Sequence, residues 1–133
     1  MTRIKKLWLY DLFDSEYNQR HHHTEPGSDP YLDKKDQFRY CQNVNIIKGF
    51  IPDSFDVGVP DAVSFLHIDL NKVEGEIAAL ETMWDRLTVG CLCVLDDYGQ
   101  HNYAPQKLAE DAFFARRGYH ILELPTGQGI VLK

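Results

Sequence analysis

The sequence lacks long hydrophobic segments and an excess of basic residues. No stretch approaches the roughly 18 consecutive apolar residues that a membrane-spanning helix needs. The opening residues Met1–Ile4 do not begin a secretory signal peptide. The net charge of −6 offers no positive surface for nucleic acid and disfavours contact with an anionic membrane. These absences predict a cytoplasmic protein whose partners are neither nucleic acids nor membranes.

Cysteine is also scarce. The chain has 133 residues and three cysteines, of which Cys91 and Cys93 point to the same face of one expected strand. This count and placement favour buried, reduced thiols over a disulfide framework. The length suits one domain with its own core. We therefore expect a single domain, possessing no disulfides, that covers residues 1–133.

Short apolar runs and amphipathic segments alternate along the chain. Four runs are typical of strands: Leu7–Tyr10, Val44–Lys48, Ser64–Ile68 and Cys91–Leu95. Two segments have the apolar periodicity of helices: Val73–Leu87 and Ala104–Arg116. The polar segment Asp14–Asp36 predicts a loop that ends in a short helix near Lys34–Tyr40. At the C-terminus, Tyr119–Leu124 and Gly129–Leu132 flank a turn and predict an antiparallel hairpin.

The segment Ser64–Gln100 is the most informative, because it predicts a strand, a helix and a second strand in a parallel βαβ unit. Asp69 follows the first strand and Asp96 and Asp97 follow the second, so the three carboxylates should meet at one edge of the sheet. Carboxylates brought together in this way repel one another unless a cation stabilises them. Oxygen ligands without a thiolate favour Mg²⁺ over Zn²⁺. The alternative is that these residues cap the next helix or lie in solvated loops.

Four segments together carry a resemblance to a known family: Asn43–Gly49, His67–Asn71, Leu95–Gly99 and Leu124–Gly129. They resemble S-adenosylmethionine-dependent methyltransferases of the macrocin O-methyltransferase type, and the resemblance runs from about Leu7 to Lys133. It implies a Rossmann-like α/β fold, a three-layer sandwich whose mostly parallel sheet ends in an antiparallel hairpin. Relative to the family, this fold would be truncated at the N-terminus.

The resemblance also implies an activity, a metal and an acceptor. Asp69, Asp96 and Asp97 match the family positions that hold Mg²⁺, and the acceptor would be a hydroxyl group of a sugar or natural product. Asp69 would also lie beside the S-adenosylmethionine cofactor. Asp11 is the nearest match to the residue that accepts hydrogen bonds from the cofactor ribose. The alternative for Asp11 is an ordinary aspartate that starts a turn at the end of a strand.

One departure from the family concerns the catalytic base. Asn71 occupies the position where the family has an aspartate that is often proposed as the base, and a neutral amide cannot take up a proton. His101, just after Asp96–Gly99, is a candidate with a suitable intrinsic pKa. A histidine in a loop is equally well explained as merely solvated. His67, inside a strand, is expected to be a core or interface histidine.

A further departure concerns the cofactor. The family's first strand and the glycine-rich loop after it have no match before Leu7. We therefore expect weak S-adenosylmethionine binding. We also expect one of two arrangements: association with another chain, or direct pairing of the Leu7 and Phe65 strands. Direct pairing gives the strand order 3-2-4-5-7-6 in the family's numbering. The other chain would be a second copy or a missing N-terminal half. A non-catalytic partner-binding module or half of a split enzyme stays open. A phosphoacceptor signalling domain fits less well. Such domains place an acidic pair after their first strand, whereas here the pair Asp96 and Asp97 follows a late strand.

Overall fold

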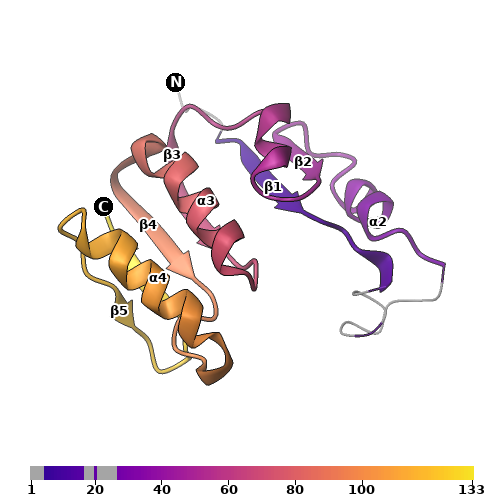
Figure 1. The fold of residues 1–133 in the computed structure, drawn as a ribbon. Helices are drawn as coiled ribbons and strands as arrows, with labels where there is room; N and C mark the ends of the chain where they lie inside the picture. Colours follow the sequence, from indigo (N-terminus) through magenta and orange to yellow (C-terminus); the bar gives the residue numbers. More distant parts are fainter. Residues whose placement is uncertain (1–4, 17–19, 21–26) are drawn as a thin grey trace. The chain divides into compact units, whose positions relative to one another are not determined.

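A computed structural model describes residues 5–16, 20 and 27–133. Part of the expected loop at Asp14–Asp36 lies outside the described residues. The chain divides into two compact units, Met1–Val59 (unit 1) and Pro60–Lys133 (unit 2), and each is described by itself (Figure 1). That the whole chain acts as one domain stays a prediction. None of the helices in the described residues has the length and apolar character to cross a bilayer.

Among its described residues, unit 1 contains a small parallel sheet and short helices. Its elements are β1 (Leu7–Asp11), α2 (Pro30–Gln37), β2 (Val44–Lys48) and the 3₁₀ helix η1 (Asp53–Val57). β1 and β2 pair in parallel, as the two apolar runs predicted. The expected start of the short helix near Lys34 is wrong. Asp29 Oδ1 accepts the N–H of Tyr31 at 2.9 Å and Pro30 takes the first helical position, so α2 begins four residues before Lys34.

Unit 2 contains a four-stranded sheet and two longer helices. Its elements are β3 (Val63–Ile68), α3 (Val73–Met83), η2 (Trp84–Arg86), β4 (Leu87–Leu95), η3 (His101–Tyr103), α4 (Ala104–Ala115), β5 (Leu122–Glu123) and β6 (Gly129–Leu132). The strand order is β3-β4-β6-β5, with β3 parallel to β4 and β6 antiparallel to both its neighbours. The predicted α/β class, the parallel βαβ unit and the C-terminal hairpin are confirmed.

The expected direct pairing of the second and fourth family strands would join the two units, and it stays a prediction. In the part of the chain that the structure describes, β1 pairs with β2 in one sheet and β3 pairs with β4 in another. The predicted order is therefore found within each sheet.

The core of unit 2 lies where α3 and α4 cover the sheet (Figure 1). Leu80, Phe113 and Phe114 are fully buried, and Cys93 and Leu95 contribute the sheet side of the same core. Cys91 and Cys93 are buried and unpaired, as predicted. Burial raises the pKa of the Cys93 thiol to about 12, so it stays protonated.

The join between α3 and β4 differs from the sequence prediction. Leu87 belongs to β4 instead of ending the helix, and Gly90 lies within the strand with φ 83°. The pairing with β3 shifts in register between Val63 and Phe65. Only glycine adopts this φ without strain. Gly90 therefore forms an irregularity in a strand that begins earlier than the sequence predicts.

Candidate active site

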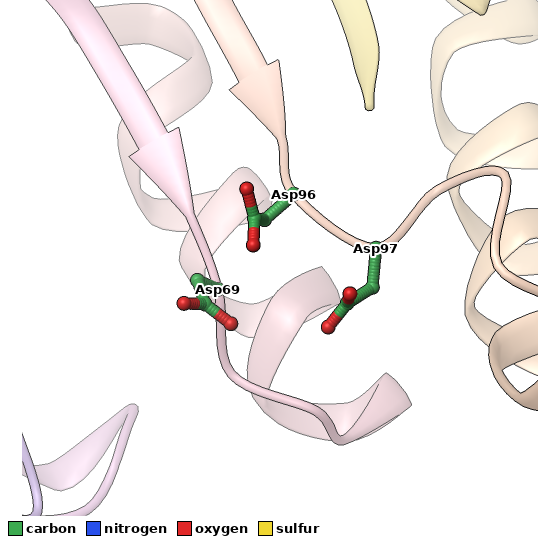
Figure 2. Close-up of side chains that lie close together, drawn as sticks. All are labelled: Asp69, Asp96 and Asp97. Atoms are coloured by element: carbon green, nitrogen blue, oxygen red, sulfur yellow. The ribbon is translucent and has the colours of Figure 1, made fainter. Parts of the chain in front are cut away.

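The carboxyl ends of β3 and β4 hold the acidic residues of the candidate site. Asp69 directly follows β3, and Asp96 and Asp97 directly follow β4. The Asp96 N–H donates to the Ile68 carbonyl at 3.0 Å, which ties the two strand ends together. Figure 2 shows the three carboxylates pointing into one space, and one oxygen from each lies within 4.8 Å of the others. The predicted convergence of these side chains is confirmed.

The arrangement of these charges suits a divalent cation. Partial burial raises the pKa of Asp97, and the negative charges of Asp69 and Asp96 raise it further. Mg²⁺ binds oxygen at about 2.1 Å, so two ligands of one ion lie at most about 4.2 Å apart. Of three octahedral ligands at most one pair lies at this limit and the other pairs lie about 3.0 Å apart, so the carboxylates would move closer to bind one ion. Three hard, negatively charged oxygens within 4.8 Å of one another supply the type of donor that Mg²⁺ prefers.

Asp96 is oriented by two residues whose role the sequence did not reveal. Gln128 Nε2 donates to Asp96 Oδ1 at 2.8 Å, and His67 Nε2 lies 3.4 Å from the same oxygen. Of the two expectations for His67, the core is wrong, because 44% of its side chain is exposed. The interface stays a prediction. His67 precedes Asp69 by two residues in an extended segment, so the two side chains share one side of the strand. Gln128 lies within the C-terminal segment that carries the resemblance.

A close approach of two turns places Gln128 beside Asp96. The Gly99 N–H donates to the Gly127 carbonyl at 2.7 Å. A Cβ atom on Gly99 would lie 3.2 Å from the Gly127 Cα and 2.8 Å from Glu123 Oε1. Only glycine lets the two backbones come this close. The glycine therefore links the turn after β4 to the hairpin turn.

Tyr98 anchors the same turn from inside. Its hydroxyl donates to Asp111 Oδ1 at 2.6 Å, and its ring packs against Gly129, where an added Cβ would lie 2.7 Å from Tyr98 Cγ. Burial and the bond to Asp111 raise the pKa of Tyr98. The phenol is therefore a structural donor at neutral pH, not a source of phenolate.

The remaining sequence candidates occupy different surroundings. Asn71 is exposed in the turn before α3 with φ 57°, and His101 is exposed in η3. Asp11 lies in unit 1, at the end of β1, where its Oδ1 accepts the Phe13 N–H at 3.3 Å. This bond is the strand-end turn that was the alternative for Asp11. The catalytic roles of Asn71 and His101 and the cofactor roles of Asp11 and Asp69 stay predictions.

A parallel βαβ unit with carboxylates at its carboxyl edge and a terminal antiparallel hairpin is the architecture of a Rossmann-like methyltransferase fold. The model of the family described as "Macrocin-O-methyltransferase (TylF)" matches residues 3–120, which is most of the chain. The chain belongs to this family. The resemblance carried by the four sequence segments is therefore confirmed.

Solved structures share the fold at low sequence identity. The structure described as "Structure of the O-methyltransferase NovP" aligns with a TM-score of 0.75 and 15% identity, over 98% of this chain and 61% of NovP. CalS11, described as "TDP-rhamnose 3'-o-methyltransferase, an enzyme in Calicheamicin biosynthesis", aligns with a TM-score of 0.68 and 16% identity, over 96% of this chain and 58% of CalS11. The chain thus spans about three fifths of these proteins. No curated protein matches its sequence.

Proposed function

We propose that this chain serves in an S-adenosylmethionine-dependent, Mg²⁺-assisted O-methyltransferase of the cytoplasm, whose acceptor is a hydroxyl group of a sugar or natural product. The observation that carries the proposal is the convergence of Asp69, Asp96 and Asp97, with oxygens within 4.8 Å, in a member of this family. The names of NovP and CalS11, both O-methyltransferases, support the reaction class. The sugar substrate for which CalS11 is named supports the acceptor class.

In this proposal the three aspartates hold the cation, which when bound lowers the pKa of the acceptor hydroxyl and orients it. Gln128 keeps one oxygen of Asp96 turned inward through its 2.8 Å hydrogen bond. Partial burial of Asp97 limits its contact with water and so strengthens its interaction with a positive charge.

The remaining candidates contact the acceptor and the cofactor in this proposal. Asn71 can donate and accept hydrogen bonds to the acceptor but cannot take its proton. His101 is the proposed base. Asp11 accepts hydrogen bonds from the cofactor ribose, and Asp69 lies beside the cofactor.

The transfer of a labelled methyl group tests this function. The chain is incubated with methyl-labelled S-adenosylmethionine and a panel of nucleotide-linked deoxysugars, with MgCl₂ or with EDTA. We expect label on a hydroxyl group only with MgCl₂, and loss of most transfer in Asp96→Asn. Titration with S-adenosylhomocysteine measures cofactor affinity separately, because the lack of a match to the glycine-rich loop predicts weak binding.

The runner-up is a non-catalytic partner-binding module or half of a split enzyme. The coverage of only about three fifths of NovP and CalS11 favours it as the second candidate. Retained binding of MgCl₂ with no methyl transfer at millimolar S-adenosylmethionine would support this function over the first.

A further inference from the structure

Unit 1 contains a hollow between α2 and β2, which lie side by side (Figure 1). The hollow has a volume of about 260 Å³. It is lined by Tyr31, Lys35, Phe38 and Arg39 from α2 and the turn after it, and by Val44 and Ile46 from β2. A cavity of about 150 Å³ is large enough to bind benzene, so a hollow of this size can hold a ring compound. All of its lining residues belong to unit 1, whereas the proposed cation site belongs to unit 2.

The charged residues of α2 lie on different sides of the helix. Tyr31, Lys35 and Phe38 follow one another at intervals of four and three residues, so they share the side that faces the hollow. At the same helical spacing, Asp33 and Asp36 fall on other sides. The hollow therefore receives a positive charge among apolar side chains, although the net charge of the chain is −6.

Two ammonium groups lie over one aromatic ring at this hollow. Lys35 Nζ is 5.3 Å and Lys48 Nζ is 5.8 Å from the centroid of the Tyr31 ring. Within the described residues, neither lysine forms an ion pair with a carboxylate. Asp11 lies opposite Lys48 in the sheet register, but its Oδ1 accepts the Phe13 N–H. The ring attracts each ammonium group while the two cations repel each other, so an anion bound between them would stabilise the arrangement.

Arg39 also lines the hollow, but its charge already has a partner. Its Nη1 donates to Asp36 Oδ2 at 2.8 Å, and its Cζ lies 4.6 Å from the centroid of the Tyr40 ring. The positive charge that a ligand can use is therefore that of the two lysines over Tyr31. An anion that carries more than one negative charge can interact with both of them.

We propose that the hollow is a binding site for a nucleoside diphosphate. The phosphate groups contact the ammonium groups of Lys35 and Lys48, and the base lies against Phe38. A diphosphate matches two separate cations, and a flat base can stack on an aromatic ring and cover apolar side chains. A sugar phosphate would instead present hydroxyl groups to a lining that offers them few hydrogen bonds. The inference does not depend on the proposed function, because this site needs no Mg²⁺.

Calorimetric titration of the full chain with three probes tests the ligand class. The probes are thymidine diphosphate, thymidine and inorganic pyrophosphate, each in EDTA, which removes divalent cations that could link phosphates to the three aspartates. We expect thymidine diphosphate to bind at least about tenfold more tightly than either other probe, because only it occupies both parts of the site. Equal affinity for pyrophosphate and thymidine diphosphate would show that the base is not held and would overturn the inference, as would no binding of thymidine diphosphate.

Three substitutions separate the site from general charge attraction. Lys35→Met and Lys48→Met keep an apolar stem and remove one charge each, and each should weaken thymidine diphosphate binding by about tenfold. Lys34→Met is the matched control, because Lys34 lies on the same helix, does not line the hollow and donates to Gln37 Oε1 at 2.9 Å. Its affinity should stay within about twofold of the native chain. Equal losses in all three variants would mean that the ligand senses only the net charge, and the assigned site would be wrong.

Amide chemical shifts locate the ligand and separate this inference from the proposed function. With thymidine diphosphate in EDTA, the amides of Lys35 and Ile46 should shift most, while that of Gly118 in unit 2 stays unchanged. Shifts centred on Asp69 and Asp97 would overturn the inference. If the hollow binds the nucleotide and the chain transfers no methyl group with MgCl₂, the proposed function fails and this site stands. Methyl transfer without nucleotide binding in EDTA would have the opposite meaning.

Discussion

Unit 2 contains two groups of carboxyl side chains in different surroundings. Asp69, Asp96 and Asp97 lie at the edge of the sheet and reach solvent, whereas Glu76 and Glu110 are buried between α3 and α4. Like charges repel in both groups. A cation from solution can neutralise the exposed group, but only a proton is small enough to neutralise the buried pair without opening the core. The same chemical group therefore favours binding in one place and protonation in the other.

The largest expected effect comes from neutralising the exposed group. Asp96→Asn or Asp97→Asn should weaken MgCl₂ binding by at least about a hundredfold, because one of three charged ligands is lost. The midpoint of thermal unfolding should stay unchanged or rise by about 1–3 °C, since repulsion is relieved. Calorimetry and thermal unfolding without added metal measure the two quantities. A fall in both affinity and thermal midpoint would indicate that these aspartates support the fold and not a cation.

The next effect concerns the buried pair and pH. The folded-state pKa values of Glu76 and Glu110, about 7 and about 8, lie above the ordinary value of 4.5. At pH values between the ordinary pKa and these raised pKa values, the folded chain binds more protons than the unfolded chain. The free energy of unfolding should therefore fall as pH rises from about 5 to about 8. Urea unfolding at a series of pH values measures this slope.

A substitution isolates the contribution of Glu110. Its neighbours include the acidic Glu76 and Asp111, and its charge in turn raises the pKa of Cys93 and Tyr98. Glu110→Met should raise the free energy of unfolding at pH 8 by on the order of 2 kcal/mol and flatten the pH slope. An unchanged slope in this variant would contradict the proposed protonation of the pair.

The smallest effect concerns the orientation of Asp96. Gln128→Ala removes the 2.8 Å hydrogen bond to Asp96 Oδ1 and should weaken MgCl₂ binding by about tenfold. Gln100→Ala is the matched control, because this glutamine is exposed in the neighbouring turn. Its affinity should stay within about twofold of the native chain. Equal losses in the two variants would mean that Gln128 has no special role in orienting the carboxylate.

The exposed group could be predicted from sequence because its residues directly follow apolar strands. Once Ser64–Ile68 and Cys91–Leu95 are identified as parallel strands, the edge at which Asp69 and Asp96 emerge is determined. Gln128 could not be placed in the same way. Its contact with Asp96 depends on the close approach of Gly99 and Gly127, which is a tertiary feature.

The buried pair could not be predicted because a glutamate on a helix is usually solvated. One signal was present: Glu76 lies three residues after Val73 and four before Leu80, within the apolar stripe of α3. Glu110 similarly precedes the buried Phe113 by three residues. Helical periodicity predicts that these two positions face the core. Only the tertiary structure shows that the glutamate side chains themselves stay buried there.

The most direct test of the cation site is paramagnetic mapping with Mn²⁺. Substoichiometric MnCl₂ is added to the isotopically labelled chain, and the broadening of each amide resonance is recorded before and after excess MgCl₂. We expect the amides of Asp69, Asp96 and Asp97 to broaden first, the Gly118 amide at the far end of α4 to stay sharp, and MgCl₂ to reverse the effect. Broadening centred on other acidic residues, or none at these three, would contradict the assignment of a divalent-cation site to the edge of β3 and β4.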